Sequence, residues 1–244
     1  MQANPKKIKQ QFKKSIAKYS DNAIVQKLIA EKLSSYLSGK HFEYVLEIGA
    51  GSGILTDFIS QRCDFTNYYA NDLVEKSEMY LRKFIPDCKF FAGDFRKISF
   101  DGRKFNLVLS NAVFQWYENL DKIFEQCRHL LSDDGLLCFS TFSPDNFKEI
   151  RELTGLTLNY KTSDEIKSAL CEYFEIINFE QWTQVVNFDN PLKILAHMKN
   201  TGVNSLAESN WGIKEVREFC GNYLEIFPNL SLTYSPITVL AKRK

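Results

Sequence analysis

The feature that most constrains this chain is a short apolar segment that leads straight into three alternating glycines. Residues 44–48 have the composition of a buried strand, and residues 54–62 have the apolar spacing of a helix. Between them stand Gly49, Gly51 and Gly53. Glycine lets the main chain turn sharply and approach a ligand closely, and the following helix presents its N-terminal N–H groups there. The pattern predicts a strand, a nucleotide-binding loop and a helix in succession.

The alternation of strands and helices continues along the chain. Strands are expected near residues 68–71, 89–92, 105–110 and 136–142, and helices near residues 23–37, 75–84 and 120–131. Alternating elements with short connections indicate a mostly parallel sheet with helices on both faces. We therefore predict an α/β fold with a doubly wound sheet, whose ligand binds at the carboxyl ends of the strands.

The second half of the chain indicates additions to this core. A capping-box helix is expected at residues 162–173, a strand at 174–188, helices at 190–202 and 213–227, and a last strand within 232–241. No signal separates two independent domains, so we expect one domain over residues 1–244. Its expected parts are an N-terminal helical lid segment (1–40), a cofactor-binding core (41–189), a helical insertion that forms a lid (190–228) and the last strand (229–244).

Charge and cysteine content argue against several classes of function. The net charge is only +1, which gives no electrostatic reason to expect nucleic-acid or membrane binding. The six cysteines form no C-x-x-C pair and the three histidines show no metal-ligand spacing, so no metal is expected. Scattered cysteines, together with the lack of a signal-peptide or transmembrane pattern, favour a cytoplasmic protein.

The glycine loop does not fit a nicotinamide dinucleotide, because that fingerprint needs a third glycine where Ile54 stands. Residues 47–53 (Glu-Ile-Gly-Ala-Gly-Ser-Gly) resemble instead motif I of the class I methyltransferases, whose loop packs against the methionine part of S-adenosylmethionine. Asp72 follows the second predicted strand, where a carboxylate can accept both hydrogen bonds of a ribose diol. By the same resemblance, Asp94 and Phe95 after the third strand would contact the adenine amino group and ring.

Four further segments narrow the resemblance to one family. They are residues 111–116 (Asn-Ala-Val-Phe-Gln-Trp), the spaced motif from Phe12 to Gln26, residues 195–204 and residues 232–234. Together they resemble the malonyl-acyl carrier protein O-methyltransferases of biotin synthesis over almost the whole chain. Ser20 departs from the family, which often carries an acid at this position.

The resemblance implies a fold, a reaction and a set of contacts. The fold would be a seven-stranded, mostly parallel, Rossmann-like sheet. The reaction would methylate the free carboxylate of a malonyl thioester to its methyl ester, with S-adenosyl-L-homocysteine as the second product. The residues expected to contact S-adenosylmethionine are Tyr19, Glu47, Gly49, Ala50, Gly51, Gly53, Asp72, Leu73, Asp94, Phe95 and Asn111.

No residue is predicted to act as a general base. A carboxylate with a solution pKa near ~4 is already ionised at neutral pH, so catalysis would depend on positioning. Tyr19, Gln115, Trp116 and Lys199 are the candidates for positioning, although aromatic residues often only pack and an exposed lysine often contacts no ligand. His197 is expected to pack or to lie at the surface.

The first 18 residues carry six lysines and no acid. A solvated arm explains such a run. Because acyl carrier proteins are acidic, Lys6, Lys7, Lys13 and Lys14 are also candidates for docking a malonyl-carrier protein. Two rival functions stay open at this point. One is a methyltransferase for another small carboxylic acid or a coenzyme A ester, and the other is a regulatory protein that binds the cofactor without turnover.

Overall fold

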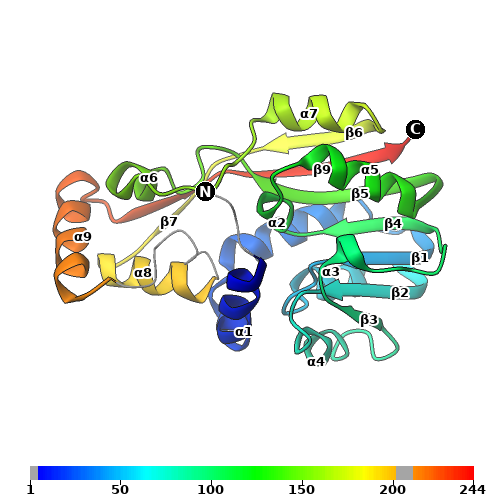
Figure 1. The fold of residues 1–244 in the computed structure, drawn as a ribbon, viewed down its shortest axis with the longest axis horizontal. Helices are drawn as coiled ribbons and strands as arrows, with labels where there is room; N and C mark the ends of the chain where they lie inside the picture. The colour runs from blue at the N-terminus through cyan, green and yellow to red at the C-terminus, as the bar shows by residue number, and fades with distance from the viewer. Residues whose placement is uncertain (1–4, 202–210) are drawn as a thin grey trace.

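The main element of the computed structural model is a seven-stranded sheet in the order β3-β2-β1-β4-β5-β9-β6 (Figure 1). The structure describes residues 5–201 and 211–244, without the side chains of residues 5–8 and 17. The strands of this sheet are β1 (His41–Ile48), β2 (Asp64–Asp72), β3 (Lys89–Ala92), β4 (Phe105–Ser110), β5 (Leu131–Phe142), β6 (Phe174–Gln181) and β9 (Pro236–Arg243). Neighbours are parallel except around β9, which is antiparallel to both β5 and β6. The predicted doubly wound, mostly parallel sheet is confirmed.

The order of the strands reverses between β1 and β4. From β1 the chain moves outward to β2 and β3, and then returns to β4 on the other side of β1. The loops that leave β1 and β4 therefore run in opposite directions and leave a crevice at the carboxyl ends of these strands.

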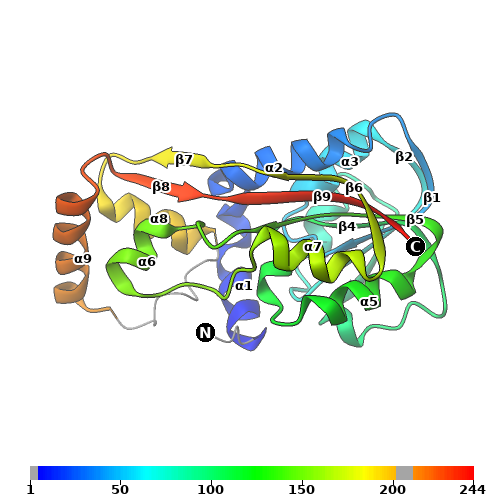
Figure 2. The same cartoon turned by 90° about the horizontal axis from the view of Figure 1, so that it is seen from above.

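Helices cover both faces of the sheet, with α2 and α3 on one side and α5 and α7 on the other (Figure 2). Side chains of β4 alternate accordingly, since Leu107 and Leu109 belong to the core under α2, whereas Val108 belongs to the core under α5. Both cores are closed, because these three side chains are fully buried. The helices are α1 (Pro5–Asn22), α2 (Ile24–Ser35), α3 (Ile54–Arg62), α4 (Ser77–Leu81), α5 (Leu120–Leu130), α6 (Lys148–Thr154), α7 (Ser163–Cys171), α8 (Pro191–Asn200) and α9 (Ile213–Ile226), with 3-10 turns η1 (Phe95–Lys97) and η2 (Phe114–Trp116).

Two runs that the sequence pattern predicts as single strands are each divided in the structure. Residues 174–188 form β6 and β7 (Gln184–Asn187), and residues 232–241 form most of β8 (Ser231–Tyr234) and β9. β7 and β8 pair with each other in a separate two-stranded sheet near α6, α8 and α9 (Figure 1). No glycine or proline interrupts residues 174–188, so the sequence pattern does not signal the first division. The second division falls at Ser235, and β9 begins at Pro236, which can stand at the first position of a strand.

Local capping signals confirm where two of the helices begin. The Thr162 side chain accepts a hydrogen bond from the Glu165 N–H, and the Glu165 carboxylate accepts one from the Thr162 N–H, which completes the predicted capping box of α7. Asn190 caps α8, and Pro191 occupies its first turn.

Two kinds of feature are missing from the described parts of the chain. No helix within residues 5–201 and 211–244 has the length and apolar character needed to cross a bilayer. The same residues contain no group of three or more His, Cys, Asp or Glu side chains placed to hold a metal ion.

The packing of α2 on the sheet gives a stability prediction. Leu33 is fully buried, whereas Leu28 on the same helix is 41% exposed. We expect Leu33→Ala to lower the free energy of unfolding by about 3–5 kcal/mol, because it leaves a cavity in the core, and Leu28→Ala to lower it by about 1 kcal/mol or less. Urea denaturation of both variants measures the difference. Equal losses would contradict the packing described here.

Candidate active site

A cavity of about 860 Å³ lies at the carboxyl ends of β1 to β4, where the strand order reverses. We call it the main cavity. One wall is formed by the loops after these strands and the other by one side of α1. The predicted site residues that line it are Tyr19, Glu47, Gly49, Ala50, Gly51, Asp72, Leu73, Asp94, Phe95, Asn111 and Trp116. The remaining predicted residues, Gly53, Gln115 and Lys199, are not part of this lining.

The glycine loop folds against the end of β2. The N–H groups of Gly49 and Ala50 donate to the carbonyl oxygen of Asn71 at 2.8 and 3.0 Å. Gly49 has φ 70°, and a Cβ at this position would lie 2.4 Å from Cγ2 of Val113, so a larger residue does not fit. Gly53 lies outside the cavity wall and caps the start of α3 with φ 81°. Its place in the fold is therefore the turn into the helix.

Asp72 connects the glycine loop to the loop after β2. Its Oδ2 accepts the N–H of Gly51 at 2.8 Å, and its Oδ1 accepts the N–H of Val74 at 2.7 Å. Burial raises the pKa of this carboxyl, and the two backbone N–H donors oppose that rise. Each carboxylate oxygen has two lone pairs, so Asp72 retains acceptor capacity toward the cavity that it lines.

Glu47 is a second buried acid in the wall. Its Oε2 accepts hydrogen bonds from the hydroxyls of Thr56 and Tyr68, each at 2.6 Å, and the residue is 1% exposed. Burial raises the pKa of this carboxyl to about 7, and the negative charge of Asp72 contributes to the rise. Glu47 therefore titrates near neutral pH, and a cation in the cavity would favour its ionised form.

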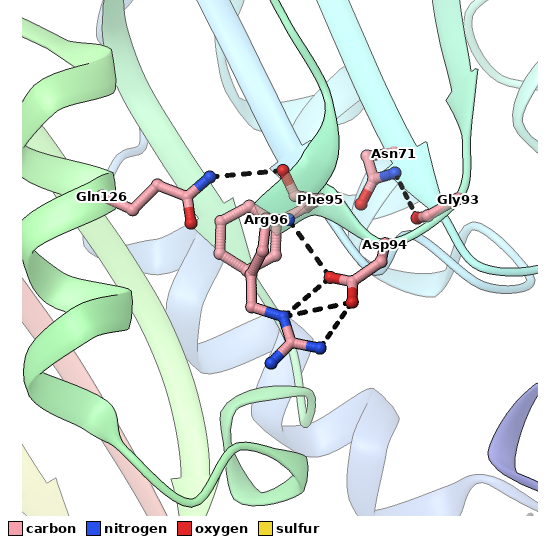
Figure 3. Close-up of polar contacts among 6 residues, drawn as sticks. All are labelled: Asn71, Gly93, Asp94, Phe95, Arg96 and Gln126. Carbon is pink, nitrogen blue, oxygen red and sulfur yellow. Dashed lines mark hydrogen bonds and ion pairs between the residues drawn. The ribbon is translucent and has the colours of Figure 1, made fainter. Parts of the chain in front are cut away.

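Asp94 is held by a residue that the sequence pattern did not single out. The Arg96 guanidinium bridges both oxygens of the Asp94 carboxylate, with Nε 2.9 Å from Oδ1, and lowers the pKa of that carboxyl (Figure 3). Arg96 also lies over the ring of Tyr117. Phe95 is buried beside this pair, and its carbonyl accepts a hydrogen bond from Gln126 (Figure 3). The sequence does not signal Arg96, because the ion pair joins residues only two positions apart in the turn that follows β3.

The α1 side of the main cavity is aromatic. Phe12 lies 5.7 Å from the ring of Tyr19 and 6.3 Å from that of Trp116, measured between ring centroids. Burial raises the pKa of the Tyr19 phenol, with a smaller contribution from Asp72, so the phenol stays neutral. Ser20 donates from its hydroxyl to that of Ser52 at 2.9 Å. This bond joins α1 to the glycine loop.

A smaller cavity of about 20 Å³ adjoins the main one, and we call it the side chamber. The two cavities share the residues Phe12, Tyr19, Gln26, Ala112 and Trp116. Gln115 lies in the side chamber, where its Nε2 donates to the Ala112 carbonyl at 2.6 Å. The other residues that line the side chamber are Phe142, Asn146, Phe147, Leu158, Tyr160, Thr201 and Tyr234.

Lys199 lines neither cavity and is exposed on α8. His197 on the same helix is buried, with Nε2 2.5 Å from the hydroxyl of Tyr234, and burial lowers the pKa of this imidazole to about 4.

Lys13 and Lys14 are exposed on α1. The side chains of Lys6 and Lys7 lie outside the described residues, as do residues 202–204 of the segment 195–204. The structure therefore brings Gln115 and Trp116 together, but not Lys199.

Asn111 joins the end of β4 to two neighbouring elements. Its Oδ1 accepts from the Ser140 hydroxyl at 2.8 Å, and its Nδ2 donates to the Gln26 carbonyl at 3.1 Å. The site therefore offers buried acids, backbone groups and aromatic rings, and the described lining of the two cavities contains no histidine. Such a site can hold and orient a nucleoside-like cation.

Comparisons with known proteins agree with this architecture. A family profile described as a methyltransferase domain matches residues 46–139. The malonyl-[acyl-carrier protein] O-methyltransferase of Chlorobium luteolum is 32% identical, over 97% of this chain and 95% of its own length. The enzyme of the same name from Haemophilus influenzae is 31% identical, over 97% of this chain and 94% of its own length. The solved N-methyltransferase NodS of Bradyrhizobium japonicum, in complex with S-adenosyl-L-homocysteine, shares the fold with a TM-score of 0.59 at 11% identity, over 97% of this chain and 98% of that chain.

The two kinds of likeness carry different weight. At 11% identity the solved structure supports the fold alone. The sequence relatives extend over nearly the full length of both chains, and therefore cover the elements around both cavities as well as the sheet. The chain has the class I methyltransferase fold, and it belongs to the malonyl-[acyl-carrier protein] O-methyltransferase family.

Proposed function

We propose that the protein transfers a methyl group from S-adenosylmethionine to the free carboxylate of a malonyl thioester on an acyl carrier protein, an early step of biotin synthesis. The observation that carries the proposal is the main cavity itself. Its glycine loop is fixed by a buried carboxylate, and its aromatic wall is shared with a side chamber. The names of the near-full-length relatives support the choice of substrate.

The main cavity suits S-adenosylmethionine in size and in polar groups. Gln26 Oε1 is buried in its wall and has no hydrogen-bond partner among the described residues, so it can accept from the ammonium group of the cofactor. A Cβ at Gly93 would meet nothing within 4 Å, which leaves space beside Asp94. Asp72 would accept the ribose hydroxyls, and Asp94 with Phe95 would contact adenine. The methionine part would lie along residues 49–51, with Tyr19 and Asn111 beside it.

The chemistry needs orientation rather than proton transfer. The cofactor supplies an electrophilic methyl group on a positively charged sulfur. A malonyl carboxylate is ionised at neutral pH and attacks with an oxygen lone pair, so no base has to remove a proton. Holding both partners in a cavity that excludes water can lower the activation free energy by roughly 7–11 kcal/mol in favourable intramolecular cases. Tyr19 and Trp116 are proposed to provide this restriction, since they form the wall between the two cavities.

The carrier protein is proposed to dock on α1. Lys9, Phe12 and Tyr19 line the main cavity from one side of this helix, and Lys13 and Lys14 are exposed. A basic surface beside the opening would attract an acidic carrier and deliver its thioester to the site. Lys6 and Lys7 extend the same run of lysines in the sequence.

The acceptor test separates the proposal from its rivals. We expect methyl transfer to malonyl thioesters and none to acetyl thioesters, which lack the carboxylate. Transfer to succinyl thioesters should be slower, because a ~1 Å displacement of the nucleophile can lower the rate by about 100-fold. Mass spectrometry of the carrier-bound product should show a base-labile methyl ester. Transfer to carbon, to nitrogen or to a free acid instead would refute the substrate, and binding of the cofactor without transfer to any acceptor would favour a regulatory protein.

The role of Asp72 can be tested by binding alone. We expect Asp72→Ala to weaken binding of S-adenosylmethionine by roughly 1.5–3 kcal/mol, the scale of hydrogen bonds to a charged group. Calorimetry is the measurement. Asp64→Ala, at the exposed opposite end of β2, is the matched control and should bind normally. Unchanged affinity in Asp72→Ala would remove this residue from the cofactor site.

Glu47 predicts a pH dependence of cofactor binding. Its pKa near 7 means that the carboxyl is largely protonated at pH 6 and ionised at pH 8. A cationic ligand favours the ionised form, so the affinity for S-adenosylmethionine should rise by ~3- to 10-fold over this interval, with release of a proton. The variant Glu47→Gln should lose this rise. Wild-type affinity that is flat or falls between pH 6 and 8 would contradict the assignment.

Docking on α1 predicts a salt effect that depends on the substrate. Rates on malonyl-carrier protein should fall more steeply with added salt than rates on malonyl-coenzyme A, because only the carrier presents a wide acidic surface. Charge reversal at Lys13 and Lys14 should raise KM for the carrier and leave cofactor affinity unchanged. Reversal at Lys104, which precedes β4, and at Lys242, which pairs with Leu136 in the first half of β5, is the control, because both lie away from the carboxyl ends of the parallel strands. Equal salt slopes for the two substrates would exclude this docking surface.

A further inference from the structure

The side chamber contains a hydroxyl group whose direction can be deduced. Asn146 Oδ1 accepts the backbone N–H of Ser235 at 3.2 Å, which fixes the orientation of this amide. Asn146 Nδ2 therefore points to Tyr160 and donates to its hydroxyl oxygen at 2.9 Å. Because Tyr160 accepts this bond, its own O–H proton is not used by Asn146. Tyr160 is 8% exposed and lines the side chamber, so the proton is available there to an acceptor.

The other polar groups that line the side chamber alone are engaged with the protein. Gln115 uses one Nε2 hydrogen on the Ala112 carbonyl, and its Oε1 is an acceptor that is buried without a partner among the described residues, so this amide presents an oxygen as well as an N–H. Tyr234 is engaged with His197. Tyr19, Gln26 and Trp116 belong to the main cavity as well as to the chamber. Among the described hydroxyls that line the side chamber alone, Thr201 donates to the His197 carbonyl, and Tyr160 is the one whose proton has no assigned acceptor.

No lysine or arginine contributes to the described lining of the side chamber, and no acid does so either. Lys199, the cation predicted nearby, is exposed on α8. Burial raises the pKa of the Tyr160 phenol, so this group stays neutral at physiological pH. An anion bound here would thus meet neutral hydrogen bonds on the protein side.

We propose that the side chamber seats the carboxylate of the acceptor, and that the Tyr160 hydroxyl, oriented by Asn146, is its hydrogen-bond donor. This inference rests on the proposed function and adds to it the group that recognises the acid. A volume of about 20 Å³ suits a group slightly larger than one water molecule, such as a carboxylate. The shared wall of Tyr19 and Trp116 places the chamber beside the main cavity, where the methyl donor would lie.

Neutral recognition fits the charge balance of the transfer. A lone pair of the carboxylate oxygen forms the new O–CH₃ bond, and the S–CH₃ bonding pair returns to sulfur. One negative and one positive charge disappear, and no proton is gained or lost. A lysine or arginine paired with the carboxylate would stabilise the charged ground state and withdraw electron density from the nucleophile. A phenol O–H orients the carboxylate but stabilises its negative charge less and withdraws less electron density from the attacking oxygen.

The test measures binding to protein that is saturated with S-adenosyl-L-homocysteine, so that no turnover occurs. Malonyl-coenzyme A and acetyl-coenzyme A are titrated separately, and the ratio of their affinities reports recognition of the carboxylate. Tyr160→Phe should lower the affinity for the malonyl compound by about 10- to 100-fold and leave that for the acetyl compound unchanged. Tyr36→Phe is the matched control, because its hydroxyl bonds Glu180 and Thr238 away from both cavities. Affinity for S-adenosyl-L-homocysteine should stay the same in both variants.

Asn146→Leu tests the positioning residue. It removes the donor that orients Tyr160, and we expect the malonyl-to-acetyl affinity ratio to fall by about 3- to 10-fold. General loss of structure would lower both affinities and leave the ratio unchanged, which would overturn the positioning role. A normal ratio in Tyr160→Phe would overturn the proposal as a whole. If the wild type methylates a different acid, the proposed function fails, and weaker binding of that acid to Tyr160→Phe would still support this chamber.

Discussion

The contact on which the site depends is the carboxylate of Asp72 between two backbone N–H groups. It joins Gly51, in the loop after β1, to Val74, in the loop after β2. The glycine loop has few side chains that could fix it, so its shape relies on such main-chain contacts. Because the carboxylate is buried, losing it would leave two donors unsatisfied in the wall of the main cavity. The fold therefore sets the geometry of this wall before any ligand arrives.

The same buried acids make the main cavity favourable for a positive charge. Burial raises the pKa of Glu47 and of Asp72, and the charge of Asp72 raises that of Glu47 further. A cationic ligand would lower both pKa values, because it favours the ionised form of each carboxyl. Asp94 differs, because Arg96 already neutralises it and holds its pKa low. The end of the cavity near Glu47 is therefore the part best suited to a positive charge.

Much of the fold and of the main cavity could be predicted from the sequence, because the signals for them are local. The glycine loop and Asp72 stand at strand ends that the apolar pattern marks, so their convergence on the main cavity follows from the parallel sheet. Gly53 shares the glycine spacing but serves the turn into α3, which spacing alone cannot distinguish. Tyr160 and Asn146 carry no sequence signal, because their meeting depends on how the segments after β5 fold back. Lys199 shows the opposite case, a chemically attractive residue that the helix turns toward solvent.

The two cavities depend on a single helix. α1 contributes Phe12 and Tyr19 to both, and it is attached to the body of the protein by Ser20 at Ser52 and by the ion pair of Lys9 with Glu75. Ser52 belongs to the glycine loop and Glu75 follows β2, so both attachments lie at the edge of the main cavity. Any displacement of α1 must therefore alter the walls of the main cavity and of the side chamber together. In-line transfer needs both partners held at once, and a helix that forms part of both walls couples the positioning of one partner to that of the other.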